Sequence, residues 1–292
     1  MYVLHEHKYI IAIFVREEKF FKFQLHCQGT CEKPMKRLIL FLLVSGILVI
    51  TICIPGCTTT PQGNQTMVPA PARGSMISIV ADGKTYPAYF AVPAIPGRHP
   101  AIVLIHSFNG LEPGYKDMIN HMADDGFVVI APEWQTYGQR AGDPEVEAVI
   151  RTSVDTLKAR QEVDASKIGL TGFCAGGRYT MLFLPQVADL KAGVAFYGFP
   201  YSRGNTNNTM PVEHIGELTD PMLIIHGSRD QPSPIDGIYN YTKQLDAAGK
   251  YFELKVYQGE PHGFMITNGT LATDASANDA YDQMITFFQR ML

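Results

Sequence analysis

The sequence predicts one α/β domain, with about eight mostly parallel strands and helices on both faces of the sheet. Apolar runs of strand length alternate with helical patterns through residues 75–292. Strands that are apolar at nearly every position are typical of a parallel sheet covered on both faces. In addition, a glycine-rich segment at 172–177 lies between a strand pattern and a helix pattern and presents a single cysteine.

The elements follow in a simple order along this domain. A hairpin comes first, with strands at 76–80 and 85–91 joined by the turn pair Asp82-Gly83. Buried strands separated by helical patterns are then expected at 101–105, 127–130, 167–171, 192–197, 222–226 and 252–257. Helices are expected near 237–248 and 278–291. No large lid is expected, and the Asn-, Thr- and Gly-rich stretch 201–218 is either a flap over the pocket or a surface loop.

Composition and the positions of the cysteines argue against nucleic-acid binding, a disulfide in the domain and a metal site. The chain has 292 residues, a formal net charge of -4 and 46% hydrophobic residues, so it can bury one large core and shows no basic excess suited to nucleic acid. Of five cysteines only Cys174 falls in the domain, which excludes a disulfide there and marks a reactive thiol. Cys27 and Cys31 lack the second half of a metal site, so no metal is expected.

The N-terminal part resembles an export signal. Lys36-Arg37 precedes the uncharged apolar run 38–54, and Gly56-Cys57 closes it like a lipoprotein signal. We expect lipidation of Cys57, with an uncleaved membrane anchor or a cleaved soluble form as alternatives. Residues 35–57 would then be the signal, 58–74 a flexible tether, and 1–34 an over-extended gene start. The domain would face outward at the cell membrane.

The segment Gly172-Phe173-Cys174-Ala175-Gly176-Gly177 predicts the nucleophile. A strand-to-helix elbow needs glycines on both sides, because a Cβ there would collide with the neighbouring strand and helix. The elbow carries a thiol in place of a hydroxyl. A structural role as a small buried residue is the alternative for Cys174.

An acid and a base follow in the order expected of a hydrolase. Asp230 ends an apolar strand and its Gly-Ser-Arg-Asp loop, and His262 lies in a loop after the strand pattern 252–257. The order nucleophile, acid, base fits three groups at one edge of a parallel sheet. A turn-forming role for Asp230 and a core role for His262 are the alternatives.

Attack of the Cys174 thiolate on a carbonyl creates an oxyanion, which needs hydrogen-bond donors already in place. The backbone N–H of Ala175 is one expected donor. The other is expected from Ser107 or Phe108, in the loop after strand 101–105. The dipole of the helix that begins near Ala175, and a protonated His262, would favour the thiolate.

These motifs together resemble the dienelactone hydrolase (carboxymethylenebutenolidase-like) family of the α/β-hydrolase fold. The resemblance covers about residues 75–292 and includes Pro-Glu-Trp at 132–134 and Phe-Tyr-Gly at 196–198. It implies a Cys174-His262-Asp230 triad without a metal or organic cofactor. Ser107 falls where the family has an activating glutamate, so His262 would activate the thiol directly. The family's carboxylate-binding arginines have no clear counterpart except Arg140 or Arg178, an arginine that could instead brace the fold.

The sequence therefore predicts hydrolysis of a small ester or lactone through an acyl-cysteine. The residues expected to line the substrate pocket are His106, Trp134, Tyr137, Arg178, Tyr197 and Phe264, each of which could equally be a core or structural residue. Two alternatives remain open: a catalytically silent, surface-tethered binding protein, and a thioesterase or peptidase-like acyl hydrolase.

Overall fold

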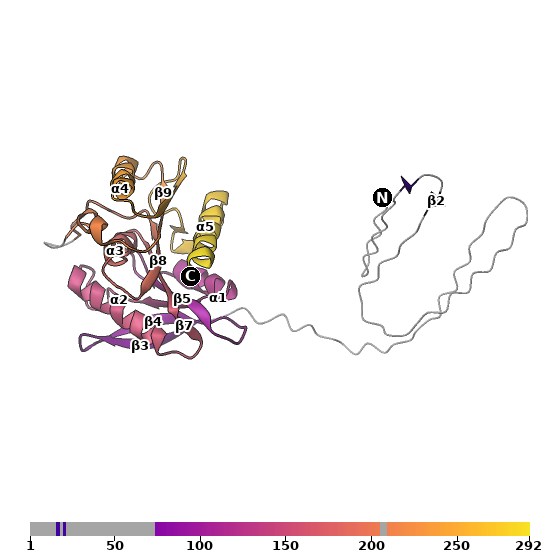
Figure 1. Ribbon diagram of the computed structural model, residues 1–292. Helices are drawn as coiled ribbons and strands as arrows, with labels where there is room; N and C mark the ends of the chain where they lie inside the picture. The colour runs from indigo at the N-terminus through magenta and orange to yellow at the C-terminus, as the bar shows by residue number, and fades with distance from the viewer. Residues whose placement is uncertain (1–15, 18–19, 22–73, 205–208) are drawn as a thin grey trace, which may run out of the picture. The chain divides into compact units, whose positions relative to one another are not determined.

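The computed structural model describes residues 16–17, 20–21, 74–204 and 209–292 (Figure 1). The unit Met1–Asn64 contributes the short antiparallel pair β1 (Arg16–Glu17) and β2 (Phe20–Phe21), and the unit Gln65–Leu292 contains every other element. The predicted signal run 38–54 and Cys57 lie outside the described residues. Within the described part of the chain, no helix is both long and apolar enough to cross a membrane.

An eight-stranded sheet forms the centre of the second unit, which confirms the predicted fold class. Its spatial order is β10-β9-β8-β7-β5-β6-β4-β3. The six strands β5 to β10 are parallel, and β4 is antiparallel to both β3 and β6. The strands are β3 (Ser75–Ala81), β4 (Lys84–Ala91), β5 (His99–Ile105), β6 (Val128–Pro132), β7 (Val163–Phe173), β8 (Leu190–Phe196), β9 (Met222–Gly227) and β10 (Phe252–Tyr257).

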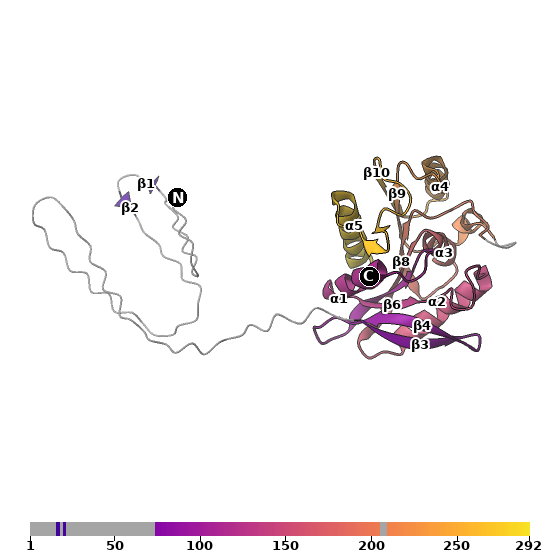
Figure 2. The same cartoon turned by 180° about the vertical axis from the view of Figure 1, so that it is seen from behind.

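Helices cover both faces of this sheet. The views in Figures 1 and 2 place α1 (Pro113–Asp124) and α5 (Ala275–Met291) on one side, and α2 (Asp143–Lys158), α3 (Ala175–Phe183) and α4 (Ile235–Ala247) on the other. Each side buries its own apolar cluster against the sheet. The central strands β5, β6 and β9 are buried along most or all of their length, as their Val/Ile/Leu-rich sequences predict.

Local sequence explains several element boundaries. Asp82 and Gly83 both have positive φ, 48° and 73°, which is the two-residue turn that suits a hairpin. Pro113 lies in the first turn of α1, where the missing N–H costs nothing. Asp274 caps α5 by accepting a hydrogen bond from the Ala277 N–H at 3.0 Å.

Two small elements of the unit Gln65–Leu292 were not predicted. A hairpin of β11 (Ile266–Thr267) and β12 (Thr270–Leu271) follows the His262 loop and packs on α1, where the Gly114 N–H donates to the Gly269 carbonyl at 2.9 Å. The 3₁₀ helix η1 (Pro211–Glu217) falls in the stretch expected to be a loop or flap. Both are too short for a hydrophobic period to reveal them.

Candidate active site

Cys174 lies at the sharp turn between β7 and α3. Its backbone has φ 58° and ψ −114°, a conformation that non-glycine residues rarely adopt. The flanking glycines make the turn possible, because a Cβ on Gly172 would collide with the Gly176 carbonyl, and one on Gly176 with the Ile105 carbonyl. The Cys174 N–H donates to the Phe196 carbonyl of β8 at 3.1 Å. Cys174 is partly buried and lies at the N-terminus of α3, the positive end of the helix dipole.

Asp230 and His262 lie next to each other on the loops that follow β9 and β10. The Nδ1–H of His262 donates to Oδ2 of Asp230 at 2.7 Å. Asp230 is buried, and its other oxygen, Oδ1, accepts the Ser233 N–H at 2.7 Å. The contact fixes the His262 tautomer, so Nε2 is the nitrogen left to exchange a proton with a nucleophile.

Backbone hydrogen bonds join the two loops that carry this pair. The Arg229 N–H donates to the Glu260 carbonyl at 3.0 Å, and the Gly259 N–H donates to the Ser228 hydroxyl at 2.8 Å. Gly227, at the end of β9, has no side chain to separate them, and a Cβ there would collide with the Glu260 carbonyl. The acid and the base are therefore held by main-chain geometry.

The electrostatics of His262 favour its protonated form. Burial by itself would lower the pKa, but the interactions with Asp230 and Cys174 outweigh it and raise the pKa of His262 to about 9. Nε2 is buried, and no hydrogen bond to it is made by the residues that the structure describes. A base that makes no hydrogen bond to its nucleophile is common before a substrate binds.

The loop after β5 lies beside the elbow, because β5 pairs in parallel with β7 through Ile105 and Gly172. The Ser107 N–H donates to the Tyr115 hydroxyl at 3.3 Å, and the Ser107 hydroxyl accepts the Asn109 N–H at 3.2 Å. Since the Ser107 amide is engaged, the Phe108 N–H is the better candidate of the two predicted donors. The Ala175 N–H belongs to the first turn of α3 and has no partner within that helix.

His106 and Trp134 are packed in the core behind this loop. Their rings stack with centroids 5.5 Å apart, and both residues are 1% exposed. His106 Nδ1–H donates to the Ser107 carbonyl at 2.8 Å, while Trp134 Nε1–H donates to the His106 carbonyl at 3.2 Å. Burial lowers the pKa of His106 to about 4, against the effect of the Ser107 bond. Trp134 thus braces the loop, and His106 stands behind it as a neutral imidazole.

Arg178, predicted as a possible substrate ligand, is committed to the fold. Its guanidinium forms two hydrogen bonds to the Asp143 carboxylate, at 2.7 and 2.9 Å, and donates to the Ser202 and Thr209 carbonyls. Its side chain is 4% exposed. These contacts correspond to a structural role that braces the fold, which the sequence analysis left open as the alternative for Arg178.

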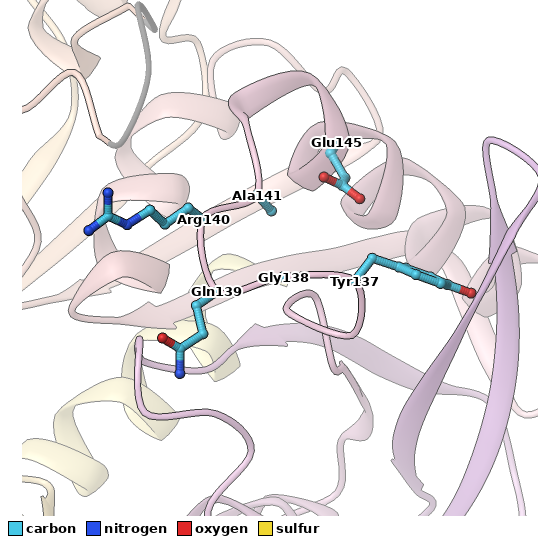
Figure 3. A pocket seen from close by; sticks show the side chains of 6 residues that line it. All are labelled: Tyr137, Gly138, Gln139, Arg140, Ala141 and Glu145. Atoms are coloured by element: carbon cyan, nitrogen blue, oxygen red, sulfur yellow. The ribbon is translucent and has the colours of Figure 1, made fainter.

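Tyr137 lies in a different place from the three residues of the predicted triad. Its hydroxyl donates to the Thr85 carbonyl of β4 at 2.9 Å. With Arg140 and Glu145 it lines an open hollow of about 480 Å³, whose lining includes none of the triad residues. Figure 3 shows the Tyr137 and Arg140 side chains pointing toward opposite sides of this hollow. Tyr137 is therefore a contact of the β3–β4 hairpin.

Aromatic rings surround His262. Tyr197 packs edge-on against it with ring centroids 5.0 Å apart, and Phe264 packs behind Tyr197 at 5.7 Å. Tyr197 has a positive φ of 36°, and burial raises its pKa well above the usual value, so the phenol is neutral. The ring of Phe199, which is half-buried, also lies near His262, with ring centroids 5.4 Å apart.

Three residues of this region were missed by the sequence analysis: Phe199, Tyr115 and His226. Phe199 follows the Phe-Tyr-Gly segment, and His226 precedes Asp230 by four residues. Their closeness in the sequence to residues already named could have indicated that they lie near the site. Tyr115 offered none, because it reaches Ser107 from the first turn of α1.

Comparisons with known proteins agree with this fold. The profile of the dienelactone hydrolase family matches residues 86–292. A Salmonella typhimurium protein named "Putative carboxymethylenebutenolidase" is 30% identical over 247 residues, covering 76% of this chain and 90% of that protein. The crystal structure of a "Putative Dienelactone Hydrolase" from Klebsiella pneumoniae superposes with a TM-score of 0.69 at 27% identity, covering 75% of this chain and 99% of the other.

A more distant structure shares the fold alone. The dienelactone hydrolase-like phosphotriesterase P91, from metagenomic libraries, is 19% identical with a TM-score of 0.64, covering 76% of this chain and 99% of that one. The family match spans most of the chain and includes the elbow and the loops that carry Asp230 and His262. The chain therefore belongs to the dienelactone hydrolase family, and it is an α/β hydrolase that acts on ester or lactone bonds.

Proposed function

We propose that the protein hydrolyses a small ester or lactone through a Cys174-His262-Asp230 triad and an acyl-cysteine intermediate. The observation that carries the proposal is the 2.7 Å hydrogen bond from His262 to Asp230, beside a cysteine on a strained elbow. The raised pKa of His262 supports a protonated imidazole that can give its proton to the leaving group.

The reaction has two halves. The thiolate attacks the carbonyl carbon and forms a tetrahedral oxyanion, which accepts hydrogen bonds from the Ala175 and Phe108 N–H groups. Collapse breaks the bond to the alcohol oxygen, which takes the proton of His262 Nε2. Water then attacks the acyl-cysteine while His262 Nε2 accepts its proton, and collapse releases the carboxylic acid and the thiolate.

The surroundings of the triad favour an uncharged substrate of modest size. Phe199 and Tyr197 pack on His262, and Phe108, on the loop of the proposed oxyanion donor, is 37% exposed. Arg178 is already neutralised by Asp143 and does not offer its charge to a substrate carboxylate. We infer that aryl or alkyl esters and lactones without a carboxylate are better substrates than dienelactone itself.

A covalent-trapping experiment tests the nucleophile. An activated aryl ester is mixed with the full chain, and the acylated peptide is identified by mass spectrometry. We expect the acyl group on Cys174 and a loss of at least about 10³-fold in kcat/KM for Cys174→Ala. Full esterase activity in Cys174→Ala, or acylation elsewhere, contradicts the proposal.

A substrate panel separates the alternatives. Matched aryl esters, lactones and thioesters with the same acyl group are compared by kcat/KM, each with and without a carboxylate. We expect the uncharged ester or lactone to rank first. Preference for thioesters favours the acyl hydrolase alternative, and binding without turnover or acyl adduct favours the silent binding protein.

We also propose, from the sequence alone, that the protein is exported and anchored at the outer face of a membrane through Cys57. The basic pair, the apolar run and Gly56-Cys57 support this. Metabolic labelling with a fatty acid should mark the wild type and leave Cys57→Ser unlabelled. An unlabelled wild type recovered with the cytosol contradicts the proposal.

A further inference from the structure

A second histidine, His226 near the end of β9, touches the carboxylate of Asp230. It is fully buried, and its Nε2 lies 2.8 Å from the Ser233 carbonyl and 3.3 Å from Asp230 Oδ2. Because a carbonyl oxygen can only accept a hydrogen bond, Nε2 carries the proton. The N–H therefore points at the Ser233 carbonyl, with the carboxylate oxygen beside it.

The other ring nitrogen of His226 shows why this residue stays neutral. Nδ1 is buried, and no described residue gives it a hydrogen-bond partner. Protonation there would bury an N–H without an acceptor, which is costly. Burial also lowers the pKa of His226, against the effects of Ser233 and Asp230. The ring can thus offer one N–H without competing with His262 for a proton.

Two hydrogen-bond donors and the ring of His226 surround the carboxylate of Asp230. Oδ1 accepts the Ser233 N–H at 2.7 Å, and Oδ2 faces both His262 at 2.7 Å and His226 at 3.3 Å. Ser233 closes a ring of contacts, since its N–H binds Asp230 and its carbonyl binds His226. The Ser233 hydroxyl donates to the Gly198 carbonyl at 2.7 Å, which ties the ring to the segment after β8.

We propose that His226 is a positioning residue, which closes the Asp230–Ser233 loop with its Nε2–H and turns Oδ2 of Asp230 toward His262. The inference rests on the proposed function, because His226 acts only through Asp230 and His262. Without its N–H, the loop is free to open and the carboxylate to rotate. His262 then loses the partner that raises its pKa, and burial lowers that pKa.

Two variants of matched size separate positioning from packing. His226→Gln can place an amide N–H near the position of Nε2, whereas His226→Leu fills the space without a donor. We expect kcat of the Leu variant to fall by about 100-fold with KM within about threefold, because a small misplacement of a reacting group has that effect. The Gln variant should recover most of the loss. His121→Gln, on the exposed surface of α1, is the control.

A second readout does not need turnover. The alkylation rate of Cys174 by iodoacetamide, followed on its peptide from pH 5 to 9, reports the thiolate. The titratable groups that interact with His262 are Asp230 and Cys174, those that interact with His226 are Asp230 and His262, and Tyr197 packs on the His262 ring. We expect slower alkylation at pH 7 in the Leu variant and near-normal rates in the Gln variant. Unchanged rates in both variants, or equal loss in both, would overturn the proposal.

Nitrogen NMR of histidine-labelled wild type covers the case in which the variants do not fold. His226 should remain a neutral Nε2–H tautomer from pH 5 to 9, and an Nδ1–H tautomer or a titration in that range would overturn the proposal. Neither this measurement nor alkylation depends on hydrolysis. Retained activity in Cys174→Ala would therefore refute the proposed function and leave the test of His226 intact.

Discussion

The loop after β5 carries a buried histidine, His106, and the loop after β10 carries a partly buried one, His262, and the pKa values of the two are shifted in opposite directions. His106 is packed against Trp134 with one backbone hydrogen bond, and burial lowers its pKa to about 4. His262 is partly buried, but a carboxylate and a thiol face it, and its pKa rises to about 9. Burial favours the neutral ring at both positions, so the partner decides which histidine can act as a charged acid.

The largest effect on activity should come from substitution of His262. His262→Gln should lower kcat/KM on the order of 10⁴-fold, because both proton transfers of the proposed mechanism pass through Nε2. His106→Asn keeps a donor for the Ser107 carbonyl and should lower kcat/KM by less than about 10-fold. Steady-state kinetics on one ester checks both variants. Equal losses would show that the β5 loop takes part in proton transfer.

Stability against pH should separate the two histidines. His262 has a raised pKa, so its contribution to the free energy of unfolding is fully present below pH 6.5 and is lost as the pH rises through about 9. His106 has a lowered pKa, so its contribution is complete above 6.5 and is lost as the pH falls through about 4. Each shift corresponds to about 3 kcal/mol.

Denaturant unfolding from pH 4 to 9.5 measures how the free energy of unfolding changes with pH. His262→Gln should flatten the alkaline side of the profile, and His106→Asn should flatten the acid side. A flattening on the wrong side would mean that the assigned pKa directions are reversed.

Substitution of two glycines, Gly227 and Gly110, compares how much the site depends on the backbone of each loop. Gly227→Ala should cost about 1–3 kcal/mol of stability and misplace His262, because its Cβ meets the Glu260 carbonyl. Gly110→Ala has open space around the Cβ but a φ of 93°, so we expect about 1–2 kcal/mol and little loss of activity. Unfolding and kcat are measured on both variants. A larger activity loss for Gly110→Ala would place the rigid part of the site in the β5 loop.

The smallest effect is expected at Ser107. Its hydroxyl accepts the Asn109 N–H, and Ser107→Ala removes that bond at a cost of about 1 kcal/mol. Activity should fall by less than about 10-fold, because in the proposed mechanism His262 and not Ser107 activates the thiol. Kinetics at pH 7 checks this, and a loss comparable with that of His262→Gln would assign activation to Ser107.

The sequence by itself determined the sheet, the elbow and the order of the three reactive residues. Strands such as β5, β6 and β9, with an apolar residue at almost every position, have few alternatives to a parallel sheet, and glycines at 172 and 176 leave room for one kind of turn around Cys174. The carboxyl ends of parallel strands share one edge, so residues after β7, β9 and β10 were expected to lie near one another.

Only the tertiary structure decided which side chain pairs with which. Arg178 meets Asp143 across 35 residues, and Tyr115 reaches Ser107 from a neighbouring helix, contacts that no periodicity encodes. His226 and Asp230 are four residues apart, yet their contact depends on the turn that brings Ser233 back to both. Hydrophobic patterning fixes where the backbone runs, whereas directional contacts of polar side chains depend on distances of a few ångströms that form only when the loops pack.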